Sequence, residues 1–364
     1  MKNIYGQFRI AAIQAASIPF DRAGSVEKAC ALIEAAAEKG ATLAAFGEAW
    51  LSGYPFFAFN APSAEYWSAT ADYYENAIEI PSPTTDKLCR AAKRAAIDVV
   101  IGIVERDHAT QGTLYCTLLF IGQEGLILGR HRKLKATNAE RAIWGDGDAS
   151  GLRTHQRGYA RISGLNCWEH NMVLPGYALM AQGTQVHVAA WPGREPISAP
   201  PAPISVWPRQ LLLSRAFASQ AVCYVVLAGG IRRGEHVPEK YRHLQSFDHT
   251  GDSYIIDPRG EIIAGPAEGE EIIIAEGSLE AIYAAKAACD VGGHYSRPDI
   301  FQLAINRNVP QRIVELASPV PVHFRADERR TDTLKDRDSF STKKAHTRSA
   351  NRSISRETAE QDRS

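Results

Sequence analysis

The sequence lacks a long apolar run, a signal-peptide pattern and closely spaced cysteine pairs, and each absence excludes a class of protein. No stretch approaches about 18 uninterrupted apolar residues, so we expect no membrane-spanning helix. Residues 1–17 lack the order of charged, apolar and small residues that marks a signal peptide, which predicts a cytoplasmic protein. The six cysteines include no C-x-x-C pair, and in a chain of 364 residues this predicts free thiols rather than a disulfide framework.

Two kinds of ligand site are also missing from the sequence. The chain carries 41 basic and 41 acidic residues and has no basic stripe interleaved with aromatics, so nucleic acid is not an expected partner. No glycine-rich loop of the phosphate-cradling kind occurs, so no nucleotide is implied. The chain does have 45% apolar residues, enough to bury a large core as one big α/β domain or two smaller ones.

Apolar periodicity predicts alternating strands and helices in both halves of the chain. In the first half, strands are expected at 8–14, 42–46, 98–105, 114–121 and 125–128, and helices at 25–39 and 84–96. In the second half, strands are expected at 159–166, 185–190, 221–228, 253–257, 261–264 and 271–276, and helices at 171–182 and 208–220. Two such halves indicate two sheets, each covered by helices on one face and packed together by the other. The pattern would also permit a doubly wound sheet.

The last part of the chain differs in composition from the rest. Residues 323–364 are rich in Asp, Glu, Lys and Arg, and Phe324 and Phe340 are their only aromatic residues. Such a segment cannot bury enough apolar surface to fold alone. We therefore expect a folded domain at 1–322 and a flexible charged tail at 323–364.

One cysteine lies where a nucleophile could be presented. Cys167 follows the predicted strand 159–166 and precedes the predicted helix 171–182. A strand-to-helix turn holds a side chain at the rim of a sheet, and the N–H groups of a nearby helix end favour the thiolate. A buried structural thiol is the ordinary alternative for a lone cysteine.

A nucleophile needs a base and a group that holds developing negative charge, and two isolated charges qualify. Glu48 closes the apolar run 42–47, and an apolar loop punctuated by glycine and proline follows it. This setting predicts a partly buried carboxylate whose pKa is raised toward that of a working base. Lys133 follows the predicted strand 125–128 within a basic run, which by itself usually marks a solvated face.

Glu48, Lys133 and Cys167, in this order and each at a strand end, resemble the catalytic triad of the nitrilase superfamily. The resemblance covers roughly residues 8–303, and the segments that carry it are 46–55, 131–147, 166–170, 186–192 and 293–299. Four positions depart from the residues usual in the family, and they are Gly47, Ala49, Ala136 and Ala149. These departures change loop stiffness rather than remove a catalytic group.

The resemblance implies a four-layer αββα sandwich, with the triad at strand ends along one edge, and a catalytic domain at 1–322. It implies that Cys167 is the nucleophile, Glu48 the general base and Lys133 the group that binds the negative charge of the tetrahedral intermediate. Glu140 matches the family's second glutamate and is expected to orient Lys133. The residues expected to border the substrate pocket are Tyr54, Trp168, Glu169, His170 and Trp191. Cys167 and His170 also mimic half of a metal site, but no second ligand pair has matching spacing, so no metal is expected.

The activity implied by the resemblance is that of a nitrilase, which converts an organic nitrile to the carboxylic acid and ammonia without a cofactor. An aliphatic amidase or carbamoyl-amine hydrolase would reuse the same four residues, and a cyanide hydrolase has a similar pocket motif. Residues 168–170, His187 and the segment 293–299 favour nitriles. A non-catalytic assembly protein on this scaffold is the alternative from another class, and the intact triad argues against it.

The resemblance also implies a homodimer that can extend into a spiral homo-oligomer. Its candidate contacts are segments near residues 60–74 and 229–242. The expected small-molecule partner is a nitrile. The sequence leaves open the length of the assembly and the choice among arylaceto, aromatic and aliphatic nitriles and cyanide.

Overall fold

The computed structural model describes residues 6–194 and 206–314 of the chain. One compact unit ends at Gln311. The predicted tail at 323–364 lies outside the described residues, so its division from a domain at 1–322 stays a prediction, as does the cytoplasmic location. Among the described residues, no helix combines the length and apolar content needed to cross a membrane.

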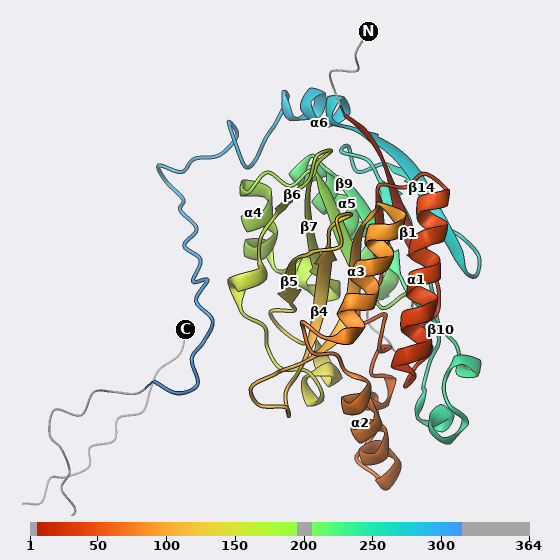
Figure 1. Ribbon diagram of the computed structural model, residues 1–364. Helices are drawn as coiled ribbons and strands as arrows, with labels where there is room; N and C mark the ends of the chain where they lie inside the picture. The colour runs from red at the N-terminus through yellow and green to blue at the C-terminus, as the bar shows by residue number, and fades with distance from the viewer. Residues whose placement is uncertain (1–5, 195–205, 315–364) are drawn as a thin grey trace, which may run out of the picture. The chain divides into compact units, whose positions relative to one another are not determined.

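The first of two large sheets has the strand order β14-β1-β2-β3-β4-β5. Figure 1 labels β1, β4, β5 and β14 of this sheet. Its strands are β1 (Gln7–Gln14), β2 (Leu43–Phe46), β3 (Asp98–Arg106), β4 (Leu114–Ile121), β5 (Ile127–Arg132) and β14 (Glu271–Ser278). The central strands β1, β2 and β3 are parallel, and the other neighbours pair antiparallel. Each strand overlaps one expected from the sequence, although β5 was expected at 125–128 and extends instead through the basic residues to Arg132.

The second sheet has the order β13-β12-β9-β8-β7-β6 and repeats the plan of the first. Its strands are β6 (His155–Gln156), β7 (Arg161–Asn166), β8 (Val186–Trp191), β9 (Tyr224–Gly229), β12 (Tyr254–Ile256) and β13 (Ile262–Ala264). Here β7, β8 and β9 are parallel and the flanking strands are antiparallel. A short ladder of β10 (Ile231–Arg232) and β11 (His249–Thr250) lies outside both sheets.

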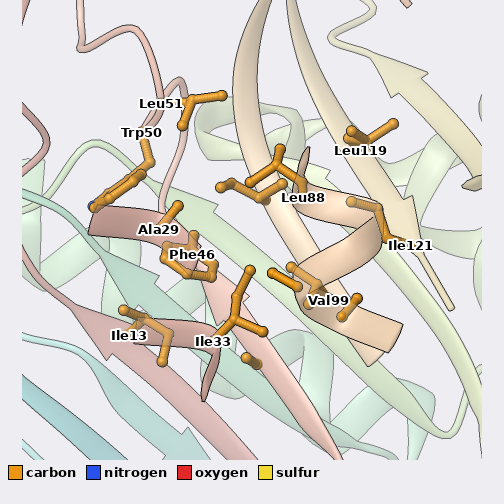
Figure 2. Packing of buried hydrophobic residues seen from close by; sticks show 14 of the residues in the cluster. Ile13, Ala29, Ile33, Phe46, Trp50, Leu51, Leu88, Val99, Leu119 and Ile121 are labelled. Carbon is orange, nitrogen blue, oxygen red and sulfur yellow. The ribbon is translucent and has the colours of Figure 1, made fainter. Parts of the chain in front are cut away.

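The sheets pack face to face because their strands are apolar on both sides. On β1, Ile10 and Ala12 belong to the core between the sheets, together with residues of β7, β8 and β9. Their neighbours Ala11 and Ile13 turn to the opposite face, where α1 (Arg22–Glu38) and α3 (Pro83–Ala95) cover the first sheet. Figure 2 shows this outer core, with Ile33 of α1 and the strand residues packed against one another.

Helices α4 (Val173–Ala181) and α5 (Val206–Ala221) cover the outer face of the second sheet in the same way. The result is a helix–sheet–sheet–helix sandwich, which confirms the predicted four-layer fold and excludes the doubly wound sheet. The 3-10 helices are η1 (Phe56–Phe59), η2 (Asn138–Ala142), η3 (Ala149–Gly151), η4 (Cys167–Asn171), η5 (Gly234–His236) and η6 (Glu239–Leu244).

Three features of the fold were not expected from the sequence. Helix α2 (Ala64–Asn76) buries Tyr66, Ala69 and Tyr73, but polar residues surround this narrow stripe. The sequence order suggests that the strand at 271–276 would continue an antiparallel run with those at 253–257 and 261–264, but β14 pairs with β1 of the first sheet. Helix α6 (Leu279–Lys286) follows directly. A strand pattern does not specify its partner, which explains why the crossing of β14 was missed.

Gly102 on β3 lies against the backbone of residues 47–49, and a substitution there tests how tightly these two segments pack. A Cβ at Gly102 would lie 2.1 Å from Gly47 O and 2.5 Å from Ala49 N, which are backbone atoms that cannot rotate away. We expect Gly102→Ala to lower the free energy of unfolding by about 1–3 kcal/mol in denaturant titrations. Gly158→Ala, which adds a Cβ with no atom within 4 Å, should be neutral or slightly stabilising. Equal stability of the two variants would contradict this tight packing.

Candidate active site

A buried lysine joins two carboxylates at the carboxyl end of the first sheet. Glu48 lies just beyond β2, and Lys133 follows the last residue of β5. Lys133 Nζ lies 2.7 Å from Glu48 Oε1 and 2.7 Å from Glu140 Oε2. All three side chains are at most 2% exposed, so water barely screens these charges.

Strand alternation selects Lys133 from the basic run. Arg130 and Arg132 lie on one face of β5, and both pair with the buried Glu105. His131 and Lys133 occupy the alternate positions and are each 1% exposed. Successive side chains of a strand point to opposite faces, so His131 and Lys133 face the site whereas Arg130 and Arg132 do not.

Glu140 is fixed by contacts on both of its oxygens. Tyr54 Oη donates to Glu140 Oε1 at 2.8 Å, and the backbone N–H of Thr137 donates to Oε2 at 2.7 Å. The same oxygen, Oε2, also accepts a hydrogen bond from Lys133 Nζ. Glu140 is therefore a second carboxylate in contact with the ammonium group, a position compatible with the orienting role expected from the sequence.

Cys167 lies at the turn from β7 into η4, at the position predicted from the sequence. Its φ is 50°, a left-handed conformation that non-glycine residues seldom adopt. Its sulfur lies within 4.8 Å of a carboxylate oxygen of both Glu48 and Glu140. The backbone N–H of Trp168 hydrogen-bonds to the sulfur.

Burial decides the protonation of the resting thiol. It raises the pKa of Cys167 well above the ordinary value, and the negative charge of Glu48 adds to this rise. The Trp168 N–H and the Lys133 ammonium favour the thiolate, but they do not outweigh burial. The turn therefore presents a protonated thiol, which needs a base before it can attack.

Glu48 has the properties of that base. Burial raises its pKa to about 7, even though Lys133 acts in the opposite direction. The Cys116 thiol donates to Oε1 at 3.5 Å, whereas Oε2 is buried and has no hydrogen-bond partner among the described residues. A carboxylate with one anchored oxygen and one unused oxygen can accept a proton from the adjacent thiol.

Glu169 connects the strand that carries Lys133 to the strand that carries Cys167. Its Oε1 accepts the backbone N–H of Leu134 at 2.8 Å, and its Oε2 accepts that of Asn166 at 2.8 Å. His131 Nε2 lies 3.0 and 3.1 Å from the two oxygens. Burial would raise the pKa of Glu169, but His131 and the two backbone donors lower it overall. Glu169 therefore holds the backbone on either side of the site.

The other predicted pocket residues occupy different positions. Trp191 is 0% exposed; its backbone O accepts the N–H of Glu48 at 3.0 Å, and its indole lies 3.3 Å from Ser214 Oγ. Trp168 is partly exposed, and the guanidinium of Arg209 lies 5.6 Å from the centre of its ring. His170 is also partly exposed, and its Nδ1 lies 2.7 Å from Cys167 O.

A small cavity of about 20 Å³ opens beside the general base, with room for about one water molecule. Its lining includes Glu48, Tyr54, Pro192, Arg232 and His249. Of the predicted site residues, only Glu48 and Tyr54 contribute to this lining in the described part of the chain. The expected pocket role of Tyr54 is thus compatible with its position.

The grouping of Glu48, Glu140 and Cys167 is one that could in principle hold a metal ion. The Lys133 ammonium already lies at hydrogen-bond distance from both carboxylates. A divalent cation in the same place would face this buried positive charge at close range. The donor set therefore suits a lysine-centred site better than a metal.

A family model described as carbon-nitrogen hydrolase matches residues 9–287. The chain belongs to the carbon–nitrogen hydrolase family. It is 50% identical over 312 residues to Nitrilase 2 of an unknown prokaryotic organism, across 85% of this chain and 96% of that protein. It is 37% identical to an aliphatic nitrilase of Rhodococcus rhodochrous, across 82% of this chain and 83% of that protein.

Solved structures of carbon–nitrogen hydrolases share the fold. Nit3 of Saccharomyces cerevisiae, a member of branch 10 of the nitrilase superfamily, superposes with a TM-score of 0.63 at 23% identity, over 79% of this chain and 96% of that one. An amidase from Nesterenkonia sp. gives a TM-score of 0.56 at 17% identity, over 78% and 95%. At these identities the likeness concerns the fold alone.

Two residues of this carbon–nitrogen hydrolase site were missed in the sequence. Cys116 on β4 contacts Glu48 through its thiol, and its backbone O accepts the N–H of Lys133 at 2.8 Å. His131 contacts Glu169. His131 could have been found, since it alternates with Lys133 along β5, whereas Cys116 lies in a uniformly apolar strand that carries no such signal.

The role of Glu169 in this carbon–nitrogen hydrolase can be tested by Glu169→Gln. The amide keeps the shape but replaces one accepting oxygen with an NH2 group, which cannot accept a backbone N–H. We expect the free energy of unfolding to fall by about 1.5–3 kcal/mol, measured by denaturant titration. Glu268→Gln, at an exposed glutamate, is the matched control and should change stability by less than about 0.5 kcal/mol. If Glu169→Gln were as stable as this control, the contacts of Glu169 with the two backbone segments would not stabilise the fold.

Proposed function

We propose that this protein is a nitrilase, which hydrolyses an organic nitrile to the carboxylic acid and ammonia without a cofactor. The observation that carries the proposal is the buried Glu48–Lys133–Glu140 cluster beside Cys167, in a chain 50% identical to Nitrilase 2 along 96% of that protein. The 37% identity to an aliphatic nitrilase supports the same substrate class.

The first chemical step is attack by sulfur. Glu48 accepts the thiol proton of Cys167 on a carboxylate oxygen, and the sulfur forms a bond to the nitrile carbon. One bond of the C≡N triple bond breaks, its electron pair goes to nitrogen, and that nitrogen takes the proton from Glu48, which is thereby ionised again. The product is a thioimidate bound to Cys167.

Two waters complete the reaction. Glu48 removes a proton from the first water, which adds to the thioimidate carbon and gives a tetrahedral intermediate. Collapse of this intermediate breaks the carbon–nitrogen bond and releases ammonia, which leaves a thioester. A second water, again activated by Glu48, cleaves the thioester to the acid and restores the thiol.

The ammonium group of Lys133 supplies the positive charge that stabilises these intermediates. Burial alone would lower its pKa, but Glu140 and Glu48 outweigh this effect and raise the pKa well above the ordinary value. The ammonium therefore stays charged throughout the working pH range. A fixed charge in a site shielded from water stabilises developing negative charge strongly, because little solvent reorganises during the reaction.

The two contact segments inferred for a homodimer or spiral oligomer lie side by side on the surface. Tyr241 Oη of η6 lies 2.8 Å from Ser68 Oγ of α2, and Lys240 Nζ lies 2.7 Å from Asp72 Oδ2. Trp67 of α2 is 60% exposed next to this contact. We propose that the two segments form one continuous homo-oligomer surface, and an exposed tryptophan supports this assignment.

An amidase or a cyanide hydrolase would use the same cluster, so the proposal is tested by substrate. Of the aromatic residues expected near the pocket, Tyr54 lines the cavity beside Glu48, and an aromatic wall would leave a polar carboxamide poorly paired. We expect kcat/KM for the best nitrile to exceed that for its matched amide by at least about tenfold, or about 1.4 kcal/mol. Ammonia release from matched pairs, and from cyanide, measures this ratio.

The control for this assay is Cys167→Ala, which should show no ammonia release while keeping its fold. Faster hydrolysis of the amides would identify an amidase instead. Activity confined to cyanide would identify a cyanide hydrolase. Release of ammonia by the alanine variant at more than about a hundredth of the wild-type rate would exclude the thiol mechanism altogether.

The pH profile should report Glu48. A general base must be ionised to accept the thiol proton, so kcat/KM should be full above the pKa of about 7 and decline as the pH falls through it. Cys116→Ala removes a hydrogen bond that lowers this pKa, and should therefore move the acid limb to higher pH. Cys223→Ala, at another buried thiol, should leave the limb in place. An acid limb that does not move in the Cys116 variant would assign the titration to another group.

A further inference from the structure

A chain of polar side chains, three of them buried and the last, His170, partly exposed, runs from the interior of the second sheet to the backbone of Cys167. Thr184 Oγ1 lies 2.6 Å from Ser163 Oγ, which lies 2.8 Å from His187 Nδ1. His187 Nε2 lies 3.1 Å from His170 Nε2. His170 Nδ1 then lies 2.7 Å from the carbonyl oxygen of Cys167. The proposed mechanism uses none of these four side chains.

The direction of every hydrogen bond in this chain follows from its end. A carbonyl oxygen can only accept, so His170 Nδ1 carries a proton. Burial lowers the pKa of His170 to about 4 and that of His187 well below its ordinary value, so both rings are neutral. His170 Nε2 must then accept from His187 Nε2, and His187 Nδ1 must accept from Ser163 Oγ. Ser163 Oγ in turn accepts from Thr184.

Stacking on aromatic rings fixes the orientation of both imidazole rings. The ring of His187 stacks on Phe217 with centroids 3.9 Å apart, and the ring of His170 stacks on Trp191 with centroids 5.2 Å apart. Stacking therefore restricts ring rotation, and the hydrogen bonds select one tautomer at each histidine. A hydrogen-bonded chain of fixed direction strengthens its last donor, because each bond polarises the next.

The receiving carbonyl belongs to the peptide that also contacts the reactive sulfur. The Cys167–Trp168 peptide accepts from His170 at its oxygen, and its N–H hydrogen-bonds to the Cys167 sulfur. Cys167 holds this peptide with a φ of 50°, which costs conformational energy unless contacts support it. The His170 donor provides such a contact.

We infer that Thr184, Ser163, His187 and His170 form a positioning relay that fixes the Cys167–Trp168 peptide and aims the Trp168 N–H at the sulfur. The relay stabilises the thiolate and the attacking geometry without touching substrate. The inference rests on the proposed role of Cys167 as nucleophile. It also extends the proposed function, since it assigns roles to residues that nitrile hydrolysis alone does not require.

The test separates thiol reactivity from nitrile turnover. Alkylation of Cys167 by iodoacetamide, followed by peptide mapping, reports the thiol directly and distinguishes it from the other cysteines. We expect His187→Leu to slow alkylation and to lower kcat by at least about tenfold, with KM within about twofold. His187→Gln keeps a donor to His170 and should recover to within about threefold of wild type in both measurements.

A pair of serine variants provides the control for folding. Ser163→Ala breaks the relay by removing one buried hydroxyl, and should slow alkylation of Cys167 by about threefold or more. Ser25→Ala removes an equally buried hydroxyl that bonds to Ile18, far from the relay in the hydrogen-bond network, and should alkylate as wild type does. Unfolding midpoints show that each variant is folded, and this pair decides the question where a histidine variant does not fold.

Each outcome bears on one hypothesis. If folded Ser163→Ala or His187→Leu were alkylated at the wild-type rate, the relay would be overturned. It would also be overturned if His187→Gln were alkylated as slowly as His187→Leu, because packing alone would then explain the loss. Failure of the wild-type protein to hydrolyse any nitrile refutes the proposed function. The alkylation comparison would still stand in that case.

Discussion

The site depends on a single buried ammonium group that pairs with two buried carboxylates. Lys133 lies 2.7 Å from both Glu48 and Glu140, and none of the three is more than 2% exposed. Removal of one partner from such a cluster leaves a buried charge unbalanced, at a typical cost of about 3–5 kcal/mol. Burial has a chemical benefit as well, because it brings the pKa of Glu48 to about 7 while it keeps Cys167 protonated. The same burial thus gives Glu48 a pKa of about 7 and raises the pKa of the Cys167 thiol well above its ordinary value.

The cluster also explains why the two sheets must meet accurately at this edge. Glu48 and Lys133 follow strands of the first sheet, and Cys167 follows a strand of the second. Glu169 joins their backbones through Leu134 and Asn166, and the N–H of Glu48 bonds to Trp191 O. Both residues were expected to border a substrate pocket, yet their observed contacts are with the protein itself. Backbone contacts of this kind hold reacting groups within the small tolerance that catalysis requires.

Much of this arrangement could be predicted from the sequence because strand ends and apolar periods are local signals. The sheets, the covering helices and the turn at Cys167 follow from such patterns, and the family resemblance selected Lys133 from its basic neighbours. Partners could not be predicted in the same way. The crossing of β14, the contact of Cys116 with Glu48 and the burial of α2 depend on residues far apart in the chain. The helix-end effect on Cys167 was expected to favour the thiolate, but burial is the larger effect.

The pairing of β14 with β1 has a consequence for synthesis on the ribosome. All eight residues of β1 pair with β14, from Gln7 with Ser278 to Gln14 with Glu271. Strand β1 therefore keeps one edge open until the chain has been translated through β14. An open apolar edge can recruit strands from other chains. In nascent chains of this protein, the edge of β1 is thus open to pairing with other chains until β14 has been made.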